Sequence, residues 1–257
     1  MDMTQWSLEN KVAIVTGAAA GGIGEAFAMT LAESGAAVVC VDINLDGAAL
    51  VAHRVRMAGG IASAVRADIT DERSVSAAVA ETIAMYGGVD ILVNNAALMV
   101  QLVGSTVTEF SRELWDSAFA ANVTGAWQFS KAVVPSMRSR GGGRIVSISS
   151  LGAFPAESVY GITKLAIVGL TTALARELGP SNITVNAIAP GYTQSEAGKK
   201  LTPPPGPVRD ALESRAATRL TGQPQELANA LLLLAAPAGE WITGQVLHVD
   251  GGYVRRP

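Results

Sequence analysis

Tyr160 and Lys164 stand at positions i and i+4 of the stretch YGITK, and the serine cluster SISS at 147–150 comes just before them. If this stretch is helical, the phenol and the ammonium project from one face, one turn apart. A free tyrosine has a pKa of about 10, but an ammonium roughly 5 Å away in a dielectric of about 20 contributes about 3 kcal/mol, or about two pKa units. The pair therefore indicates acid–base chemistry, although the same spacing also arises by chance.

A glycine-rich turn, TGAAAGGIGEA, follows the apolar run KVAIV near the start of the chain. Phe27 and Leu31 then lie one helical turn apart, and Gly35 is placed to end that helix. Backbone N–H groups and a helix N-terminus can approach a diphosphate where no Cβ intervenes. The spacing is not the common G-x-G-x-x-G, so a glycine corner without a ligand stays the alternative.

Asp42 ends the apolar run VVCVD, about twenty residues beyond the glycines, where an acidic side chain can bind both hydroxyls of an adenosine ribose. A carboxylate at this place also repels a 2′-phosphate. Neither TGAAAGGIG nor DINLD contains Lys or Arg to attract that phosphate. The sequence therefore predicts NAD rather than NADP, and a solvated carboxylate at a strand end is the alternative.

Short apolar runs alternate with longer helical patterns along the whole chain. The predicted strands are KVAIVTG, AAVVCVD, ASAVRAD, VDILVNN, GRIVSISS, NITVNAIAP and GQVLHVDGG. Continuous apolar strands joined by helices are typical of a parallel sheet covered on both faces, which predicts a doubly wound α/β fold over residues 1–257 as a single domain. The proline-rich segment 192–212 interrupts the alternation and is predicted to be a lid over the substrate site.

Composition excludes several other classes. The chain has 257 residues, 49% of them hydrophobic, and a net charge of −3, with no basic stripe for nucleic acid. Its polar start lacks a signal-peptide pattern, and no apolar run in the sequence reaches the length of a membrane span, so a cytoplasmic protein is expected. The single cysteine, Cys40, lies in an apolar run, and His53 and His248 show no metal-ligand spacing, so we expect no metal.

In this order the motifs resemble the short-chain dehydrogenase/reductase family over nearly the whole chain. The matching stretches are TGAAAGGIG, CVDIN, ADIT, NNAA, ANVTG, SISS, YGITK, NAIAPGY and TGQVLHVDGG. The resemblance implies a Rossmann-type domain with a central seven-stranded parallel sheet, a nicotinamide cofactor and a homotetramer. It implies that Tyr160 is the acid/base, Lys164 its partner and an anchor of the cofactor ribose, Ser150 the donor to the substrate oxygen, and Asn122 the holder of a proton-relay water. The tyrosinate would then work at about pH 7 to 8, helped by the charge of the oxidised nicotinamide and opposed by desolvation.

The same resemblance implies a set of cofactor contacts. The turn residues Gly17, Gly22, Ile23 and Gly24 would flank the diphosphate, and Asp42 would bind the ribose. Asp68 and Ile69 would contact the adenine, and Asn94 and Ala96 would lie along the cofactor. Pro190, Gly191 and Thr193 would lie near the nicotinamide amide, and Tyr160 and Lys164 would also touch the cofactor.

Three departures from the family pattern affect the site. The glycine turn carries one extra residue between Gly17 and Gly22, and NNAA replaces NNAG, which adds a methyl group at Ala97. The usual spacing to the tyrosine selects Ser147 as the active serine, whereas alignment of RIVSISS selects Ser150. We prefer Ser150 because it lies at the strand end, and we expect Ser149 to point to the opposite face.

The residues that flank these motifs bear on the substrate. Met99, Phe154 and Tyr192 either line an apolar substrate pocket or simply pack in the core, and the first reading favours a hydrophobic secondary alcohol or ketone. A dehydrogenase of a cis-dihydrodiol from aromatic breakdown, or a non-catalytic NAD(H)-binding sensor or scaffold, is the alternative. A sensor has no need of the Tyr-Lys pair, so an alcohol dehydrogenase or ketone reductase is preferred.

Overall fold

The computed structural model describes residues 3–102 and 106–255. Seven of its described strands form a wholly parallel sheet in the order β3-β2-β1-β4-β5-β6-β9. These strands are β1 (Val12–Thr16), β2 (Ala37–Asp42), β3 (Ile61–Arg66), β4 (Ile91–Asn94), β5 (Gly143–Ile148), β6 (Ile183–Pro190) and β9 (Val246–Val249). The predicted doubly wound, Rossmann-type α/β fold with a seven-stranded sheet is confirmed, and each predicted strand overlaps one of these, with β3 starting one residue before its predicted run ASAVRAD.

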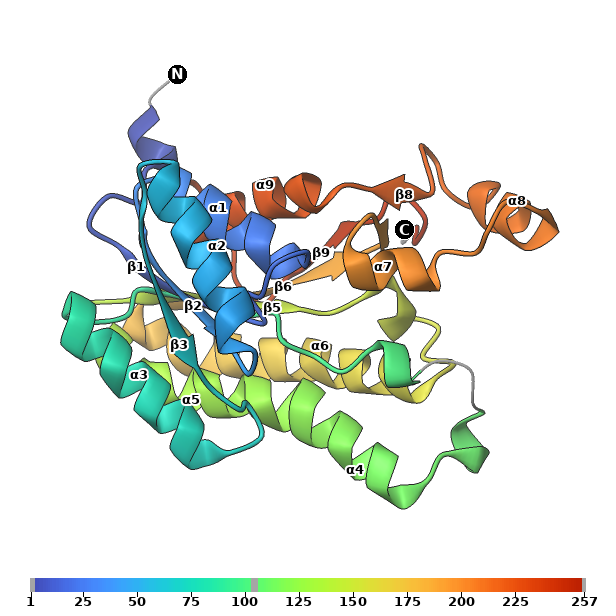
Figure 1. Cartoon of the computed structure of the whole chain (residues 1–257), viewed down its shortest axis with the longest axis horizontal. Helices are drawn as coiled ribbons and strands as arrows, with labels where there is room; N and C mark the ends of the chain where they lie inside the picture. The colour runs from blue at the N-terminus through green and yellow to red at the C-terminus, as the bar shows by residue number, and fades with distance from the viewer. Residues whose placement is uncertain (1–2, 103–105, 256–257) are drawn as a thin grey trace.

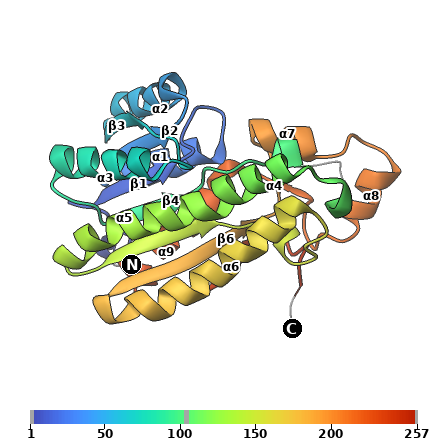
Figure 2. The ribbon, with the colours of Figure 1, turned by 90° about the horizontal axis from the view of Figure 1, so that it is seen from below.

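Helices cover both faces of the sheet (Figures 1 and 2). On one face lie α1 (Ile23–Glu33), α2 (Leu45–Met57) and α9 (Pro224–Ala235), and on the other α3 (Glu72–Tyr86), α5 (Gly125–Ser139) and α6 (Val159–Leu178). Phe27, Val51 and Leu231 pack the first layer, and Phe129 and Leu178 the second. Burial of both faces accounts for the continuous apolar runs of the strands.

The helix α6 corrects one expectation drawn from the sequence. Together with the turn after it, Val159–Ser181 is long and apolar enough to cross a bilayer by length and composition, although no apolar run of that length was expected. Core helices of water-soluble folds meet the same criteria. Here 39% of the apolar window is buried within the protein, and α6 packs against β6 with Ile167, Leu178 and Lys164 among its buried residues.

From β1 the chain adds β2 and β3 on one side of the sheet, and it then crosses back to add β4 on the other side of β1. In open parallel sheets, ligands bind outside the carboxyl ends of the strands at such a switch point. The predicted site residues follow the ends of β1 to β6 in turn, so the topology gathers them at one edge of the sheet.

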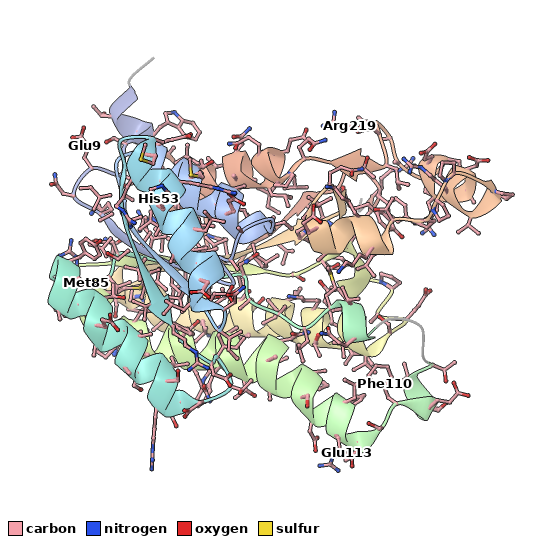
Figure 3. All side chains as sticks on the ribbon, viewed as in Figure 1. Glu9, His53, Met85, Phe110, Glu113 and Arg219 are labelled. Atoms are coloured by element: carbon pink, nitrogen blue, oxygen red, sulfur yellow. The ribbon has the colours of Figure 1, made fainter. Side chains whose placement is uncertain are left out.

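The segment 192–212 is more regular than a lid loop. It contains β7 (Tyr192–Thr193), which pairs in parallel with β8 (Thr221–Gly222), followed by α7 (Glu196–Leu201) and α8 (Pro207–Glu213). Figure 1 shows α7 and α8 beyond the carboxyl ends of the strands, and Figure 3 labels Arg219, which precedes β8. The other helical elements are α4 (Arg112–Phe119), the π-helical turn Ala120–Thr124 and the short 3-10 turns Met3–Trp6, Val100–Leu102, Val107–Glu109, Leu151–Ala153, Gly179–Ser181 and Pro237–Gly239.

Candidate active site

Tyr160 and Lys164 lie in the first turns of α6, as the i, i+4 spacing predicts. The Ser158 side chain caps the helix by accepting a hydrogen bond from the Gly161 amide at 3.0 Å. The Lys164 ammonium lies 5.6 Å from the centroid of the Tyr160 ring and donates to the Ile148 carbonyl oxygen at 2.7 Å. The last carbonyl of β5 therefore fixes the position of the ammonium beside the phenol.

The electrostatics of the pair differ from the sequence expectation. Burial raises the pKa of Tyr160 to about 12, and a hydrogen bond with Ser150 opposes this rise. Burial lowers the pKa of Lys164 to about 8. Without a cofactor, removal of the phenolate from water therefore opposes ionisation of Tyr160. The expected tyrosinate at about pH 7 to 8 depends also on the charge of the oxidised nicotinamide and stays a prediction.

The three serines at the end of β5 point to different places. The Ser147 hydroxyl is buried inside the sheet region and lies 3.3 Å from the Asn94 amide nitrogen, which donates to it. The Ser149 hydroxyl donates to the Lys164 carbonyl at 2.9 Å. Ser150 lines a cavity together with Tyr160 and accepts from the Gly152 amide at 3.1 Å. The geometry thus brings Ser150 to the phenol and leaves Ser147 in the core.

Asn122 lies in the π-helical turn between α4 and α5, and it is 2% exposed. Its Oδ1 accepts from the Leu98 amide at 2.7 Å, and its Nδ2 donates to the Leu98 carbonyl at 2.9 Å and to the Thr163 hydroxyl at 3.0 Å. Single π turns are frequent at functional sites. Here the turn aims one amide side chain so that it ties the segment after β4 to α6.

The glycine turn shows which of its glycines the backbone requires. Gly17 has φ of +65°, and a Cβ on it would lie 2.7 Å from the Cα of Ala96. A Cβ on Gly24 would lie 2.3 Å from the Gly17 carbonyl oxygen, whereas one on Gly22 would find its nearest neighbour at 3.5 Å. The lengthened turn accommodates its extra residue because Gly21 adopts a φ of +85°. The Gly21 amide donates a hydrogen bond to the Glu25 carboxylate at 2.8 Å.

The start of α1 is suited to an anionic group. Gly22 is its N-terminal cap and supplies no side-chain hydrogen bond. The first N–H groups of any α-helix have no partner within the helix, so those that begin at Ile23 are available to phosphate oxygens. The residues present therefore fit a nucleotide diphosphate.

Asp42 connects β2 to this turn. Its Oδ2 accepts from the Ala19 amide at 3.0 Å and its Oδ1 from the Asn44 amide at 2.9 Å. Each carboxylate oxygen keeps a further lone pair for a ribose hydroxyl. Asp42, Asp68 and Ile69 line one cavity of about 430 Å³, and hydrogen bonds from Thr70 hold the pKa of Asp68 below its usual value.

A second cavity of about 550 Å³ continues from the turn to Tyr160 and Lys164. The 430 Å³ and 550 Å³ cavities share Asp42, and together we call them the cofactor groove. The predicted residues Gly17, Gly22, Ile23, Asp42, Asp68, Ile69, Ala96, Tyr160 and Lys164 line it, as do Asn95 and Lys200, which the sequence argument missed. Asn94 does not line it, because its side chain faces the core and donates to Ser130 and Ser147.

A third cavity, of about 280 Å³, adjoins Tyr160 and Ser150. The predicted nicotinamide-side residues Pro190, Gly191 and Thr193 line it, together with Met99 and Tyr192 and the apolar Leu151 and Leu201 that were not predicted. We call it the substrate cavity. Phe154 is absent from its lining, and its ring packs against His248 with the centroids 4.4 Å apart.

Cys40, His53 and His248 lie outside this site. Burial raises the pKa of the Cys40 thiol to about 12, which suits a core residue. His53 is exposed on α2 (Figure 3), whereas His248 lies in β9. Across residues 3–102 and 106–255, no group of His, Cys, Asp and Glu side chains is arranged to hold a metal ion.

Known proteins share this architecture and much of the sequence. Residues 17–254 match the family model described as Enoyl-(Acyl carrier protein) reductase. The 7alpha-hydroxysteroid dehydrogenase of Escherichia coli (strain K12) is 40% identical over 253 residues, which cover 96% of each chain.

Two solved structures extend the likeness. A 7 alpha-hydroxysteroid dehydrogenase complexed with NADH and 7-oxo glycochenodeoxycholic acid matches with a TM-score of 0.90 and 37% identity over 100% of this chain and 99% of that chain. A gluconate 5-dehydrogenase from Burkholderia cenocepacia J2315 in complex with NADP and tartrate matches with a TM-score of 0.90 and 33% identity over 98% of both chains. With the fold and the order of its motifs, these matches show that the chain is an oxidoreductase that belongs to the short-chain dehydrogenase/reductase family.

Proposed function

We propose that this protein interconverts a hydrophobic secondary alcohol and its ketone with NAD(H), with Tyr160 as the acid/base. The observation that carries the proposal is the meeting of Tyr160, Ser150 and Lys164 where the cofactor groove and the substrate cavity adjoin. A nicotinamide cofactor bound in the groove supplies or accepts the hydride. The residues of the chain then have to hold the substrate oxygen and move one proton.

The proton chemistry follows from the state of Tyr160. With its pKa raised by burial, the Tyr160 hydroxyl is protonated at neutral pH and can donate to the developing alkoxide in ketone reduction. In the reverse direction, the phenolate oxygen takes the alcohol proton. Ser150 donates a hydrogen bond to the substrate oxygen, and the Lys164 ammonium stabilises the phenolate and anchors the cofactor ribose.

Asn122 positions the backbone at Leu98, which lines the cofactor groove. Its two bonds to the Leu98 backbone fix a segment that lines the cofactor groove, and its third bond joins that segment to α6. A proton-relay water beside Asn122 remains our proposal for the path by which Tyr160 exchanges its proton with solvent.

The preference for NAD over NADP rests on Asp42. Its carboxylate stands at the end of β2 with lone pairs left for the ribose hydroxyls, and its charge repels a 2′-phosphate. The related structures hold NADH in one case and NADP in another, so the argument depends on this chain's own residue.

The substrate class is inferred from the substrate cavity. Met99, Leu151, Tyr192 and Leu201 give it apolar walls, and its polar side chains are those of Ser149, Ser150, Tyr160, Thr193 and Ser195. A related solved structure is complexed with 7-oxo glycochenodeoxycholic acid, a bulky ketone that also carries a carboxylate. The segment 192–212, which supplies part of these walls through β7 and α7, is proposed to act as a lid.

We also propose that the chain works as one domain, in the cytoplasm, as a homotetramer. Trp127 is 42% exposed and Trp241 is 98% exposed, and large apolar side chains on a surface are suited to subunit contacts. Light scattering on the purified protein would give the mass of the assembly.

The proposed function is tested by following the absorbance of reduced nicotinamide after the protein is mixed with secondary alcohols, cyclic alcohols, steroids or diols. NAD⁺ and NADP⁺ are assayed in parallel. Hydride transfer from an apolar alcohol to NAD⁺ is expected. Preference for NADP⁺ would overturn the reading of Asp42, and full turnover by Tyr160→Phe would overturn the acid/base assignment. Tight NADH binding without turnover on any substrate would favour a sensor.

A further inference from the structure

The cofactor groove carries an unusual balance of charge for a site that receives a diphosphate. Its acidic lining residues are Asp42, Asp68 and Glu196. Among the described residues that line it, Lys164 and Lys200 are the cations. Lys164 is buried at the Tyr160 end and donates to a backbone carbonyl, which leaves Lys200 as the cation nearer the glycine turn.

The helix α7 is joined to that turn directly. The Glu196 amide donates to the Gly21 carbonyl at 3.1 Å, and a Cβ on Gly21 would lie 2.9 Å from the Glu196 Cγ. Because residues i and i+4 share one face of a helix, Lys200 lies on the same face as Glu196 and lines the groove with Ala20, Gly21 and Gly22.

We propose that Lys200 binds the diphosphate of the nicotinamide cofactor, so that the segment after β6 supplies the positive charge that the glycine turn lacks. This inference rests on the proposed function for the cofactor itself. The turn offers backbone N–H groups, its charged side chain Glu25 is paired with Arg54, and Asp42 and Glu196 add negative charge nearby. A diphosphate is a dianion at neutral pH, and a lysine ammonium binds phosphate oxygens as a mobile point charge.

The neighbouring residue Lys199 provides a matched control. It has the same charge, lies on the same helix and is also exposed, but its ammonium pairs with the Glu196 carboxylate at 2.9 Å and it does not line the groove. Replacement of either lysine by methionine keeps the length of the side chain and removes only the charge.

The test measures NADH affinity by fluorescence titration for the wild-type protein, Lys200→Met, Lys199→Met and Lys200→Arg, with ADP and adenosine as competing fragments. We expect Lys200→Met to weaken NADH and ADP binding about fivefold, as for an exposed ion pair, with a smaller dependence on salt. Adenosine binding, Lys199→Met and Lys200→Arg should stay within about twofold of wild type.

Equal effects of the two methionine variants would overturn the inference, and so would an equal loss of adenosine binding by Lys200→Met. A defect of Lys200→Met confined to the KM of an anionic substrate would also overturn it and would place the lysine at the substrate instead. Absence of NADH binding by the wild-type protein would refute the proposed function itself, a result distinct from a failure of Lys200 alone.

Discussion

Replacement of Asn122 by alanine should destabilise the whole protein. The change removes three hydrogen bonds, two to the Leu98 backbone and one to Thr163, from a side chain that is 2% exposed. At about 1 kcal/mol for each bond lost, the free energy of unfolding should fall by about 3 kcal/mol. For a chain of this size the melting temperature should fall by about 6 to 10 °C.

Urea unfolding followed by circular dichroism measures this loss. Asn229→Ala is the control, because Asn229 is exposed on α9 and, among the described residues, its side chain accepts one hydrogen bond, from Gln225 four residues before it. That change should stay within about 0.5 kcal/mol of wild type. A loss below about 1 kcal/mol for Asn122→Ala would refute the reasoning, because the three bonds would then contribute little and Asn122 would act through catalysis alone.

Three further predictions concern the chemistry. Ser150→Ala should lower kcat/KM at least about a hundredfold, whereas Ser147→Ala should mainly lower stability. Steady-state kinetics and melting curves measure the two effects, and the reverse pattern would move the catalytic role to Ser147. Because burial raises the pKa of Tyr160 to about 12 and lowers that of Lys164 to about 8, the rate of ketone reduction should stay level from about pH 5 to 7 and fall above about pH 8 as Lys164 loses its charge. Initial rates of reduction that stayed level through about pH 10 would contradict this. Asp42→Ala should shift the ratio of kcat/KM values toward NADP at least about tenfold, and an unchanged ratio would mean that Asp42 does not set the preference.

The parts of the fold that repeat along the chain were predictable from the sequence. Strands such as β2 are continuous apolar runs because both faces of the sheet are covered, and such runs stand out from the amphipathic helices between them. The pair β7 and β8 was not predicted, since each has two residues and their pairing joins positions about thirty residues apart. No periodicity marks so short an element.

The site residues show the same division. Tyr160 and Lys164 share a helix face by local geometry alone, so their meeting could be predicted. Asn94 and Asn95 are neighbours in one motif, and only the direction of the last residue of β4 decides that Asn94 faces the core and Asn95 the groove. The pKa of Tyr160 was beyond reach, because burial depends on everything packed around the phenol.

The two-residue pairing of β7 with β8 makes the stretch between them an exchangeable module. Its ends are held together by the ladder from Tyr192 to Thr221 and by the bond from the Gln194 amide to the Gly222 carbonyl at 2.9 Å. Apart from Glu196 and Lys200, which adjoin the glycine turn and line the cofactor groove, residues 195–220 can therefore change in length and composition between two fixed anchor points, while the seven-stranded sheet and the Tyr160 region stay as they are. Grafting this module from a relative of known specificity is a direct route to redesigning what the protein accepts.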